Sequence, residues 1–500
     1  MEIINLNSRS ISIMLKNDFC YYNKYFFDVY LNNNFLFKTN LNVFTIFDLS
    51  PNTSYTLKVE NEIINFKTPN ELYTFNLDKF NVIADGIHDD TIKIQTAINL
   101  AKDGTTIIFK KGKYLVSSLF IKSNINLYFE QGAELISILD RLAYPVLPGD
   151  ISNINYGIWE GSIDDNFASV LNIIDASFIT IYGKGIIDSR AHLGDWYINH
   201  RNKFIAWRGH AIFIENSNNI NIIGLDIKNT FSWAIHPYLS KNLNFINLKI
   251  NNPKDMPTTD GINPDMSENI NIYGNVFDVG DDCIAIKSGT YELAKKMNMP
   301  CKNIIISNNL MLNGHGGVTL GSEISAGANN ILVEKCIFKN TERGLRIKTR
   351  RGRGSINFID DIIFRNIKMD NVLTPFVINM YYNMGPKGGH SEYVWTKEKQ
   401  IINEYTPKIG SFTFENIECK NVGYAAGAFL GLAESKIGIL KFKNIIFDYN
   451  KDIEEGYPVM IEHNFKMKNK GIYALNVLDI ILENVKFNGV DGLNIIKEES

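Results

Sequence analysis

The chain has 500 residues, of which 45% are hydrophobic and 21% are charged, a composition typical of a folded globular protein. Its net charge of −3 argues against a general nucleic-acid binder, which would normally present a strongly basic face. The five cysteines show neither metal-ligand spacing nor a disulfide framework, and no apolar run approaches the roughly 18 residues of a membrane helix. Because no basic and then apolar leader follows Met1, we expect a cytoplasmic protein, with export by a route lacking a classical signal as the alternative.

Residues 1–72 are expected to form a small all-β domain. Runs such as Tyr25–Tyr30 and Val43–Ile46 are rich in β-branched and aromatic residues and are separated by Asn-rich turns. The segment Leu49–Leu57 resembles the turn and tyrosine corner of fibronectin type III domains, which are β-sandwiches. An irregular β cap is the alternative. No nucleophile is paired with a base in this stretch, so we expect no catalytic role for it.

The remaining residues, 73–500, are expected to form one solenoid domain that begins with a capping helix at about 89–102. In that helix Ile94, Ala97, Ile98 and Ala101 recur at i, i+3, i+4 and i+7, which gives one narrow apolar face. A solenoid needs such a cap because its open end would otherwise expose apolar surface and strand edges.

From about residue 176 onward a frame of an Asn-rich turn and two short strands repeats. The first apolar residues of five copies, Ile220, Leu243, Ile270, Ile304 and Ile331, lie about 23 to 34 residues apart, a spacing typical of solenoids. The copies contain no recurring helix, no leucine-rich frame and no propeller marks. The repeat therefore predicts an all-β, right-handed parallel β-helix. Asn residues aligned in successive turns are expected to form hydrogen-bonded ladders.

Two insertions interrupt the repeat, at 188–210 and at 381–407, and both mix aromatic residues with cations. The first includes Arg201, and the second includes Lys387 and His390. Long insertions in a solenoid become surface loops, often on the binding face, and this composition would suit an anionic carbohydrate. Loops that merely pack on the solenoid are the alternative.

Four short charged motifs stand between residues 258 and 348, where a repeat should carry little charge. They are Thr258-Thr259-Asp260, Gly280-Asp281-Asp282-Cys283, Gly314-His315-Gly316 and Arg346-Ile347-Lys348. Successive turns of a parallel solenoid stack about 4.8 Å apart, so these side chains are expected to meet in one patch. Carboxylates that close raise the pKa of at least one of them, which places an acid beside ionised bases, as glycoside hydrolysis requires.

Each motif taken alone has an ordinary explanation. The Asp281-Asp282 pair could be a solvated turn or part of a calcium site, and His315 could be structural. Arg346 and Lys348 could form a solvated face of a strand. Asp265 competes with Asp260 as the third carboxylate, and the repeat alone does not choose between them.

The four motifs together resemble those of the polygalacturonase family, the glycoside hydrolases of family 28 that degrade pectin. Members of that family carry Asn-Thr-Asp, Gly- or Gln-Asp-Asp, Gly-His-Gly and Arg-Ile-Lys in this order on a right-handed β-helix. The last three motifs are intact here, and the first has Thr258 where the family has Asn. The family spacing favours Asp260 over Asp265, and the similarity extends from about residue 82 to about 450.

The resemblance implies an inverting hydrolase of α-1,4-linked galacturonic acid that uses neither a cofactor nor a metal. Asp281 would be the general acid, with His315 supporting it, and Asp260 and Asp282 would hold and activate the water. Further roles fall on substrate-binding residues: Arg346 and Lys348 would bind a substrate carboxylate, Tyr381 would close that subsite, and Asp265 is a further candidate.

The N-terminal domain and the long insertions resemble the bacterial exo-acting branch of the family, in which extra loops wall off one end of the cleft. His236 lies one turn before Asp260 and is expected to help form that end. The substrate would be a galacturonic-acid oligosaccharide or polysaccharide. Alternatives are a glycosidase for xylogalacturonan or rhamnogalacturonan oligomers, and a non-catalytic solenoid that binds acidic polysaccharide. Pectate lyases share the β-helix, but they rely on calcium and lack this order of motifs.

Overall fold

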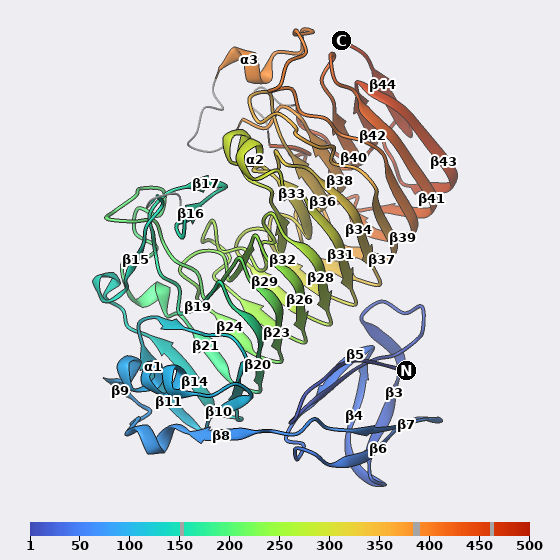
Figure 1. Cartoon of the computed structure of the whole chain (residues 1–500). Helices are drawn as coiled ribbons and strands as arrows, with labels where there is room; N and C mark the ends of the chain where they lie inside the picture. Colours follow the sequence, from blue (N-terminus) through green and yellow to red (C-terminus); the bar gives the residue numbers. More distant parts are fainter. Residues whose placement is uncertain (151–154, 384–390, 461–464) are drawn as a thin grey trace.

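The computed structural model describes residues 1–150, 155–383, 391–460 and 465–500, and it is built mainly from β-strands (Figure 1). A small antiparallel domain at the N-terminus lies beside a long parallel β-helix, whose turns stack from α1 to the C-terminus. Lys387 and His390, predicted in the second insertion, lie outside the described residues. No helix within the described ranges is long and apolar enough to span a membrane.

The N-terminal domain consists of two antiparallel sheets that enclose their own apolar core. The hydroxyl of Tyr55 accepts a hydrogen bond from the backbone N–H of Ser50 (2.8 Å), which is the contact of a tyrosine corner. The predicted domain boundary between residues 72 and 73 falls between the last antiparallel strand and the first parallel one. The strands of the two sheets are β1 (Glu2–Leu6), β2 (Ile11–Met14) and β5 (Val43–Ile46), and β4 (Asn34–Leu41), β3 (Tyr22–Leu31), β6 (Ser54–Val59) and β7 (Glu62–Lys67).

The β-helix has one long, bent sheet in which each strand pairs in parallel with the equivalent strand of the next turn. The predicted anchors stand in register, with Ile220 paired to Leu243, Leu243 to Ile270, and so on to Ile331. Its strands are β8 (Tyr73–Asn76), β9 (Asp85–Asp89), β10 (Thr105–Phe109), β11 (Gly112–Val116), β13 (Ile125–Phe129), β14 (Ala133–Ser137), β20 (Ser177–Gly183), β21 (Ile186–Asp188), β23 (Asn218–Ile223), β24 (Asp226–Lys228), β26 (Lys241–Ile246), β27 (Lys249–Asn251), β28 (Glu268–Tyr273), β29 (Val276–Val279), β31 (Cys301–Ser307), β32 (Leu310–Asn313), β34 (Ala328–Glu334), β35 (Ile337–Lys339), β37 (Ile362–Asp370), β39 (Phe412–Val422), β41 (Ile437–Tyr449) and β43 (Val477–Asn488).

Asparagine ladders run along the outside of this sheet, as predicted. Asn242 donates to Asn218 (2.8 Å), Asn269 to Asn242 (3.1 Å), Asn303 to Asn269 (2.9 Å) and Asn330 to Asn303 (2.7 Å). Each amide satisfies the one in the next turn, so the turns are held in register where the chain bends.

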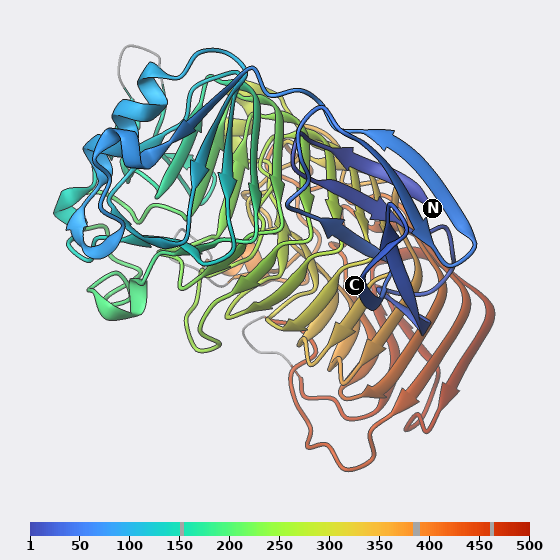
Figure 2. The same ribbon diagram turned by 90° about the horizontal axis from the view of Figure 1, so that it is seen from below.

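The predicted capping helix is confirmed as α1 (Thr91–Leu100), and Ile94, Ala97 and Ile98 are its buried residues. The N-terminal domain packs on the long sheet (Figure 2) through an apolar cluster that joins its Val43 to Ile223 and Ile246. The other helices are α2 (Tyr291–Met297), α3 (Glu392–Trp395) and the 3₁₀ helices η1 (Leu77–Phe80), η2 (Arg141–Ala143) and η3 (Ala191–Leu193).

A further face of the β-helix, called here the site sheet, carries the charged motifs. It comprises two runs of strands, joined where Ile262 bridges Ile235 and Ile284. Side chains alternate along each strand, so apolar residues such as Leu345 and Ile347 point into the core while Arg346 and Lys348 point outward. Its strands are β12 (Leu119–Phe120), β19 (Leu171–Ile174), β22 (Ile212–Glu215) and β25 (Ile235–Tyr238), then β30 (Ile284–Ile286), β33 (Val318–Gly321), β36 (Arg343–Lys348), β38 (Thr374–Asn379), β40 (Ala425–Leu430), β42 (Lys470–Leu475) and β44 (Ile495–Glu498).

Two short antiparallel pairs, β15 (Val146–Leu147) with β18 (Asn166–Phe167) and β16 (Ile158–Trp159) with β17 (Ser162–Ile163), project from the N-terminal turns over the site sheet. In Figure 1 the hairpin of β16 and β17 extends toward α2, which belongs to a later turn.

Candidate active site

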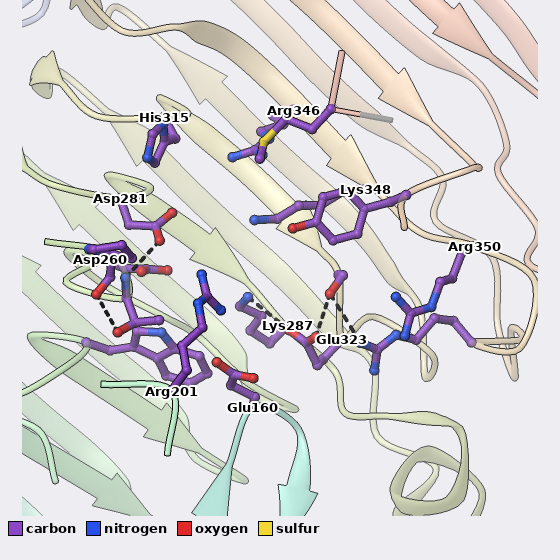
Figure 3. Close-up of a pocket in the computed structure, with 17 residues that line it drawn as sticks. Glu160, Arg201, Asp260, Asp281, Lys287, His315, Glu323, Arg346, Lys348 and Arg350 are labelled. Carbon is purple, nitrogen blue, oxygen red and sulfur yellow. Dashed lines mark hydrogen bonds and ion pairs between the residues drawn. The ribbon is translucent and has the colours of Figure 1, made fainter. Parts of the chain in front are cut away.

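A cavity of about 490 Å³ lies on the outer side of the site sheet, and charged side chains from four consecutive turns line it. Figure 3 shows Asp260, Asp281 and His315 on one side of this cavity and Lys287 and Glu323 on another, with Arg346 and Lys348 between the later strands. The structure therefore brings the four predicted motifs together at one place.

The three aspartates form a compact group. One carboxylate oxygen from each of Asp260, Asp281 and Asp282 lies within 4.8 Å of the other two. Asp260 accepts a hydrogen bond from the amide of Asn263 (2.8 Å), and Asp281 accepts one from the backbone N–H of Thr258 (2.9 Å). Asp260 and Asp282 are buried, whereas Asp281 is partly exposed and lines the cavity.

Thr258 departs from the family motif without loss of its contact to Asp281. The contact uses the backbone N–H, and Thr258 adopts a left-handed conformation with φ of +64°, which Asn adopts more readily than Thr. The hydroxyl of Thr258 accepts a hydrogen bond from Arg208, which ties this strained position to the 188–210 insertion.

Opposite electrostatic environments act on the aspartates. Burial, with the negative charges of Asp281 and Asp282, raises the pKa of Asp260 well above that of an ordinary aspartate. Burial alone would also raise the pKa of Asp282, but Lys348 (2.8 Å) and Arg346 (3.1 Å) outweigh it and hold this pKa below its usual range. The group therefore contains one aspartate whose pKa is raised beside another, Asp282, that is held ionised.

The carboxylate group is also the one set of acidic ligands, among the described residues, whose oxygens are close enough together to hold a metal ion. In the structure both oxygens of Asp282 are already engaged by Arg346 and Lys348. Arg346 and Lys348 therefore occupy the oxygens of Asp282 that a metal ion would need.

His315 lies beside Asp281 at the edge of the cavity. Its backbone N–H donates to the carbonyl of Asp281 (3.0 Å), and its Nδ1 lies 3.0 Å from Oε1 of Glu342. The hydrogen bond to Glu342 raises the pKa of His315, so the imidazole keeps its proton to a higher pH than a free histidine.

Tyr381 does not line the cavity, in contrast to the prediction that it closes a subsite. Its side chain is 1% exposed, its hydroxyl donates to the carbonyl of Gly431 (2.9 Å), and its ring faces the guanidinium of Arg351. The following residue, Tyr382, lines the cavity instead, with Lys348 above its ring. Successive side chains leave the end of a strand on opposite sides, so Tyr381 points away from the cavity and Tyr382 points into it.

His236 and Asp265 are also absent from the cavity wall, so neither predicted role in the cleft is supported. Both occupy outward positions of the site sheet, but both are fully buried, and His236 Nε2 lies 3.5 Å from Asp265 Oδ2. The cover comes from the segment that carries β15 to β18, where Leu147, Ile158 and the following Ala168 pack over this face. His236 instead packs edge-on against Trp233, and Trp233 lines the cavity.

Sequence reasoning missed three buried cavity residues, Lys287, Glu323 and Arg353. Lys287 donates to Glu323 (3.2 Å), and Arg353 donates to the other oxygen of the same carboxylate (2.8 Å). A signal existed for Lys287, which follows two inward residues of β30 at the outward position that Lys348 occupies two strands later. Glu323 and Arg353 lie in loops, where no periodic pattern points to them.

The hairpin of β16 and β17 closes one side of the cavity. The carbonyl of Gly161 accepts hydrogen bonds from both the backbone N–H and the hydroxyl of Thr290 (2.9 Å each), the residue that precedes α2. Glu160, at the tip of the hairpin, lines the cavity, as does Arg201 from the 188–210 insertion. This insertion therefore reaches the cavity, as predicted.

Stacked tryptophans support the same side. The rings of Trp159 and Trp207 are nearly parallel with centroids 5.0 Å apart, and Trp159 and Trp233 are 6.4 Å apart with an interplanar angle of 9°. Trp159 belongs to the hairpin, Trp207 to the insertion and Trp233 to the site sheet, so the stack fixes the three parts relative to one another.

Known proteins resemble this chain over more than half of its length. The model of the family described as "Glycosyl hydrolases family 28" matches residues 151–421. A protein described as "Probable polygalacturonase" from Vitis vinifera is 29% identical over 365 residues, which cover 71% of this chain and 70% of that protein. An exo-poly-alpha-D-galacturonosidase from Dickeya chrysanthemi is 26% identical over 379 residues, which cover 67% of this chain and 61% of that protein.

Solved structures confirm the fold. The family 28 exopolygalacturonase of Yersinia enterocolitica aligns with all of this chain and 97% of its own, with a TM-score of 0.70 and 19% identity. The exopolygalacturonase of Thermotoga maritima aligns with 85% of this chain and 92% of its own, with a TM-score of 0.66 and 23% identity. Likeness at these identities concerns the fold, and it supports the prediction of a right-handed parallel β-helix with a β-sandwich at its N-terminus.

Proposed function

Because the chain belongs to the glycosyl hydrolases of family 28, we propose that it hydrolyses the α-1,4 bonds of polygalacturonate and its oligomers from a chain end. The observation that carries this proposal is the group of three carboxylates within 4.8 Å, of which one has a raised pKa and another is held ionised by two cations. Two curated relatives bear polygalacturonase and exo-galacturonosidase names, which supports the same substrate.

In the proposed reaction Asp281 protonates the leaving glycosidic oxygen, because it is the aspartate that faces the cavity with partial exposure. Asp260 holds the water, and the ionised Asp282 accepts its proton as the water oxygen bonds to the anomeric carbon from the other face and the glycosidic C–O bond breaks. His315, whose pKa is raised by the Glu342 carboxylate, supports Asp281 from the adjacent turn.

The substrate's charge is matched by Arg346 and Lys348. Both line the cavity while they hold Asp282, and a guanidinium has five N–H donors, more than this contact uses. A neutral sugar at this position would offer these cations no carboxylate, so galacturonate is favoured over rhamnose or xylose units beside the scissile bond.

Action from a chain end follows from the hairpin of β16 and β17. An endo-acting enzyme needs a groove open at both ends, whereas here the docked hairpin and Arg201 bound one side of the cavity. A long chain can therefore enter only with its end first.

The test is the product profile from long polygalacturonate, followed from the first per cent of hydrolysis with EDTA present. We expect reducing ends to appear without added calcium and only mono- or digalacturonate among the early products. A ladder of intermediate oligomers would contradict the chain-end mode. Activity on rhamnogalacturonan or xylogalacturonan oligomers but not on polygalacturonate, or strict dependence on calcium, would contradict the substrate or the hydrolytic reaction.

A further inference from the structure

A second arrangement of two cations around one carboxylate lies in the cavity, and neither the four motifs nor the proposed reaction uses it. It consists of Lys287, Glu323 and Arg353, called here the Lys287 triad, whose members are 4%, 6% and 9% exposed. Burial would raise the pKa of Glu323, but Lys287 and Arg353 outweigh it and hold this pKa below its usual range. The triad therefore carries a net charge of +1 inside the protein.

Donors in this triad are left without acceptors. The guanidinium of Arg353 reaches Glu323 and Ser322 through one terminal nitrogen, and its buried Nε has no hydrogen-bond partner among the described residues. Lys287 directs two of its three N–H bonds to the carbonyl of Gly321 (2.9 Å) and to Glu323. Buried donors normally have acceptors, so these donors are suited to an anionic or polar group that comes from outside the chain.

The triad sits at the walled side of the cavity. A Cβ atom added to Gly161, in the hairpin, would lie 2.7 Å from Cβ of Glu323, so the hairpin packs directly on the triad. Figure 3 shows Glu160 and Arg201 on the side of the cavity that faces Lys287 and Glu323.

The distance to the other cations suits a substrate with two carboxylates. Lys287 continues the register in which Ile286 pairs with Leu320 and Leu320 with Ile347, so it stands two strands from Lys348. Two strand spacings amount to about 10 Å. The cavity thus presents two separate pairs of cations, with Asp281 lining the same cavity.

We propose that Lys287 and Arg353 bind the carboxylate of the terminal galacturonate unit, so that the enzyme reads one carboxylate at Arg346 and Lys348 and a second at the walled end. Glu323 holds the two cations in place and compensates their charge when the site is empty. This inference rests on the proposed function and makes it more specific: the terminal unit must be ionised, and a methyl ester on it is rejected.

The test measures binding of digalacturonate, and of its two singly methyl-esterified forms, by calorimetry in an Asp281→Asn background that prevents turnover. We expect each ester to bind the parent about ten- to a hundredfold more weakly than the diacid, because it loses charge-assisted hydrogen bonds. When Arg353→Gln is added, binding of the diacid should weaken by a similar factor, and the ester on the terminal unit should no longer bind more weakly than the diacid. When Lys348→Met is added instead, the ester on the other unit should no longer bind more weakly than the diacid.

Two further variants make the result decisive. Arg353→Lys keeps a cation beside Glu323 but removes Nε, so it should retain stability and lose most of the discrimination at the same ester. Arg365→Gln, which removes a surface arginine paired with Glu334 on the long sheet, should behave as the parent. Unchanged affinity and both penalties intact in Arg353→Gln and Arg353→Lys would overturn this inference and leave the proposed function standing. Failure of the Asp281→Asn protein to bind any galacturonide would overturn both.

Discussion

Two triads, each made of one lysine, one arginine and one carboxylate, lie in the same cavity and have different neighbours. In the first, Arg346 and Lys348 hold Asp282, and in the second, Lys287 and Arg353 hold Glu323. In both, paired cations overcome burial and keep the pKa of the central carboxylate low.

The difference lies in the charges that stand beside each triad. Asp282 has Asp260 and Asp281 within 4.8 Å, and burial together with the neighbouring charges raises the pKa of Asp260, whereas Arg350 and Arg201 line the cavity near Glu323. The same local unit thus supports proton transfer where further carboxylates surround it and anion binding where further cations do. Neighbouring charge, more than the triad itself, sets the chemistry.

The largest expected effect distinguishes the three aspartates from the Lys287 triad, because the first should determine kcat and the second KM. Asp281→Asn should lower kcat on polygalacturonate by about 10²- to 10⁴-fold, because it removes the proton that the leaving oxygen needs. Binding of digalacturonate and the thermal unfolding transition should stay close to those of the parent. In contrast, Arg353→Gln should raise KM and leave most of kcat. Near-normal turnover in Asp281→Asn would show that Asp281 is not the general acid.

The next comparison concerns the third carboxylate. Asp260→Asn is expected to cost about 10²-fold or more in kcat, whereas Asp265→Asn should change kcat by no more than about threefold, because Asp265 is covered and does not reach the cavity. An inert Asp260→Asn combined with an inactive Asp265→Asn would reverse the assignment.

The Asp265 variant also has a signature in stability. Burial raises the pKa of Asp265 to about 7, above its value in the unfolded chain near 4. Between these values the folded state binds the extra proton, so the free energy of unfolding of the parent falls as pH rises from about 4 to about 7. Asp265→Asn should remove the part of this slope that Asp265 contributes, whereas Asp260 and Glu215, whose pKa values are also raised by burial, keep theirs; denaturant titrations at several pH values would measure the difference. An unchanged slope would mean that Asp265 titrates as an ordinary carboxylate.

A smaller effect tests whether the hairpin of β16 and β17 closes the cavity beside the Lys287 triad. Gly161 has φ of +71°, and the Cβ atom of Gly161→Ala would collide with Glu323, so the hairpin should undock and early products should include longer oligomers. Gly352→Ala is the matched control, since Gly352 has φ of +89° but open space around it. The control should cost about 1 kcal/mol in backbone strain and keep the parent's products. Identical products from both variants would show that the docked hairpin does not set the chain-end mode.

The sequence was sufficient for the parts of the molecule that are periodic. Repeating apolar anchors such as Ile220 and Leu243 predict the stacked strands, because each turn must bury the same positions to continue the core. The same register predicts that Asp260, Asp281 and His315 meet, since equivalent positions of adjacent turns are neighbours. Alternation also predicts that Arg346 and Lys348 share the outer face of one strand.

The errors arose where the fold stops being periodic. Alternation places His236 and Asp265 on the outer face, but it does not reveal that Leu147 and Ile158, distant in sequence, cover them. Glu323 and Arg353 come from loops of two different turns, and their partnership depends on loop conformations that no repeat specifies. Inserted segments thus decide which outward residues meet substrate, and the repeat alone does not contain this information.

The smallest expected effect is a shift in the pH profile of activity, which should depend on His315 beside the three aspartates and not on the Lys287 triad. The Glu342 carboxylate, 3.0 Å from Nδ1 of His315, raises the pKa of His315, and the pKa of Lys287 is raised so that it stays charged throughout the working range. Glu342→Gln should therefore move the basic limb of the kcat/KM profile to lower pH, a modest shift because both side chains are partly exposed.

The sign in stability is fixed by the same pair. Because the folded pKa of His315 lies above its unfolded value, the pair stabilises the protein below pH of about 6.5, and this stabilisation is lost as pH rises through the folded pKa. Glu334→Gln, which breaks a surface pair with Arg365, is the control and should leave the profile unchanged. If Glu342→Gln left the basic limb in place, His315 would not be the group that sets it, and the proton balance of the catalytic side would depend on the aspartates alone.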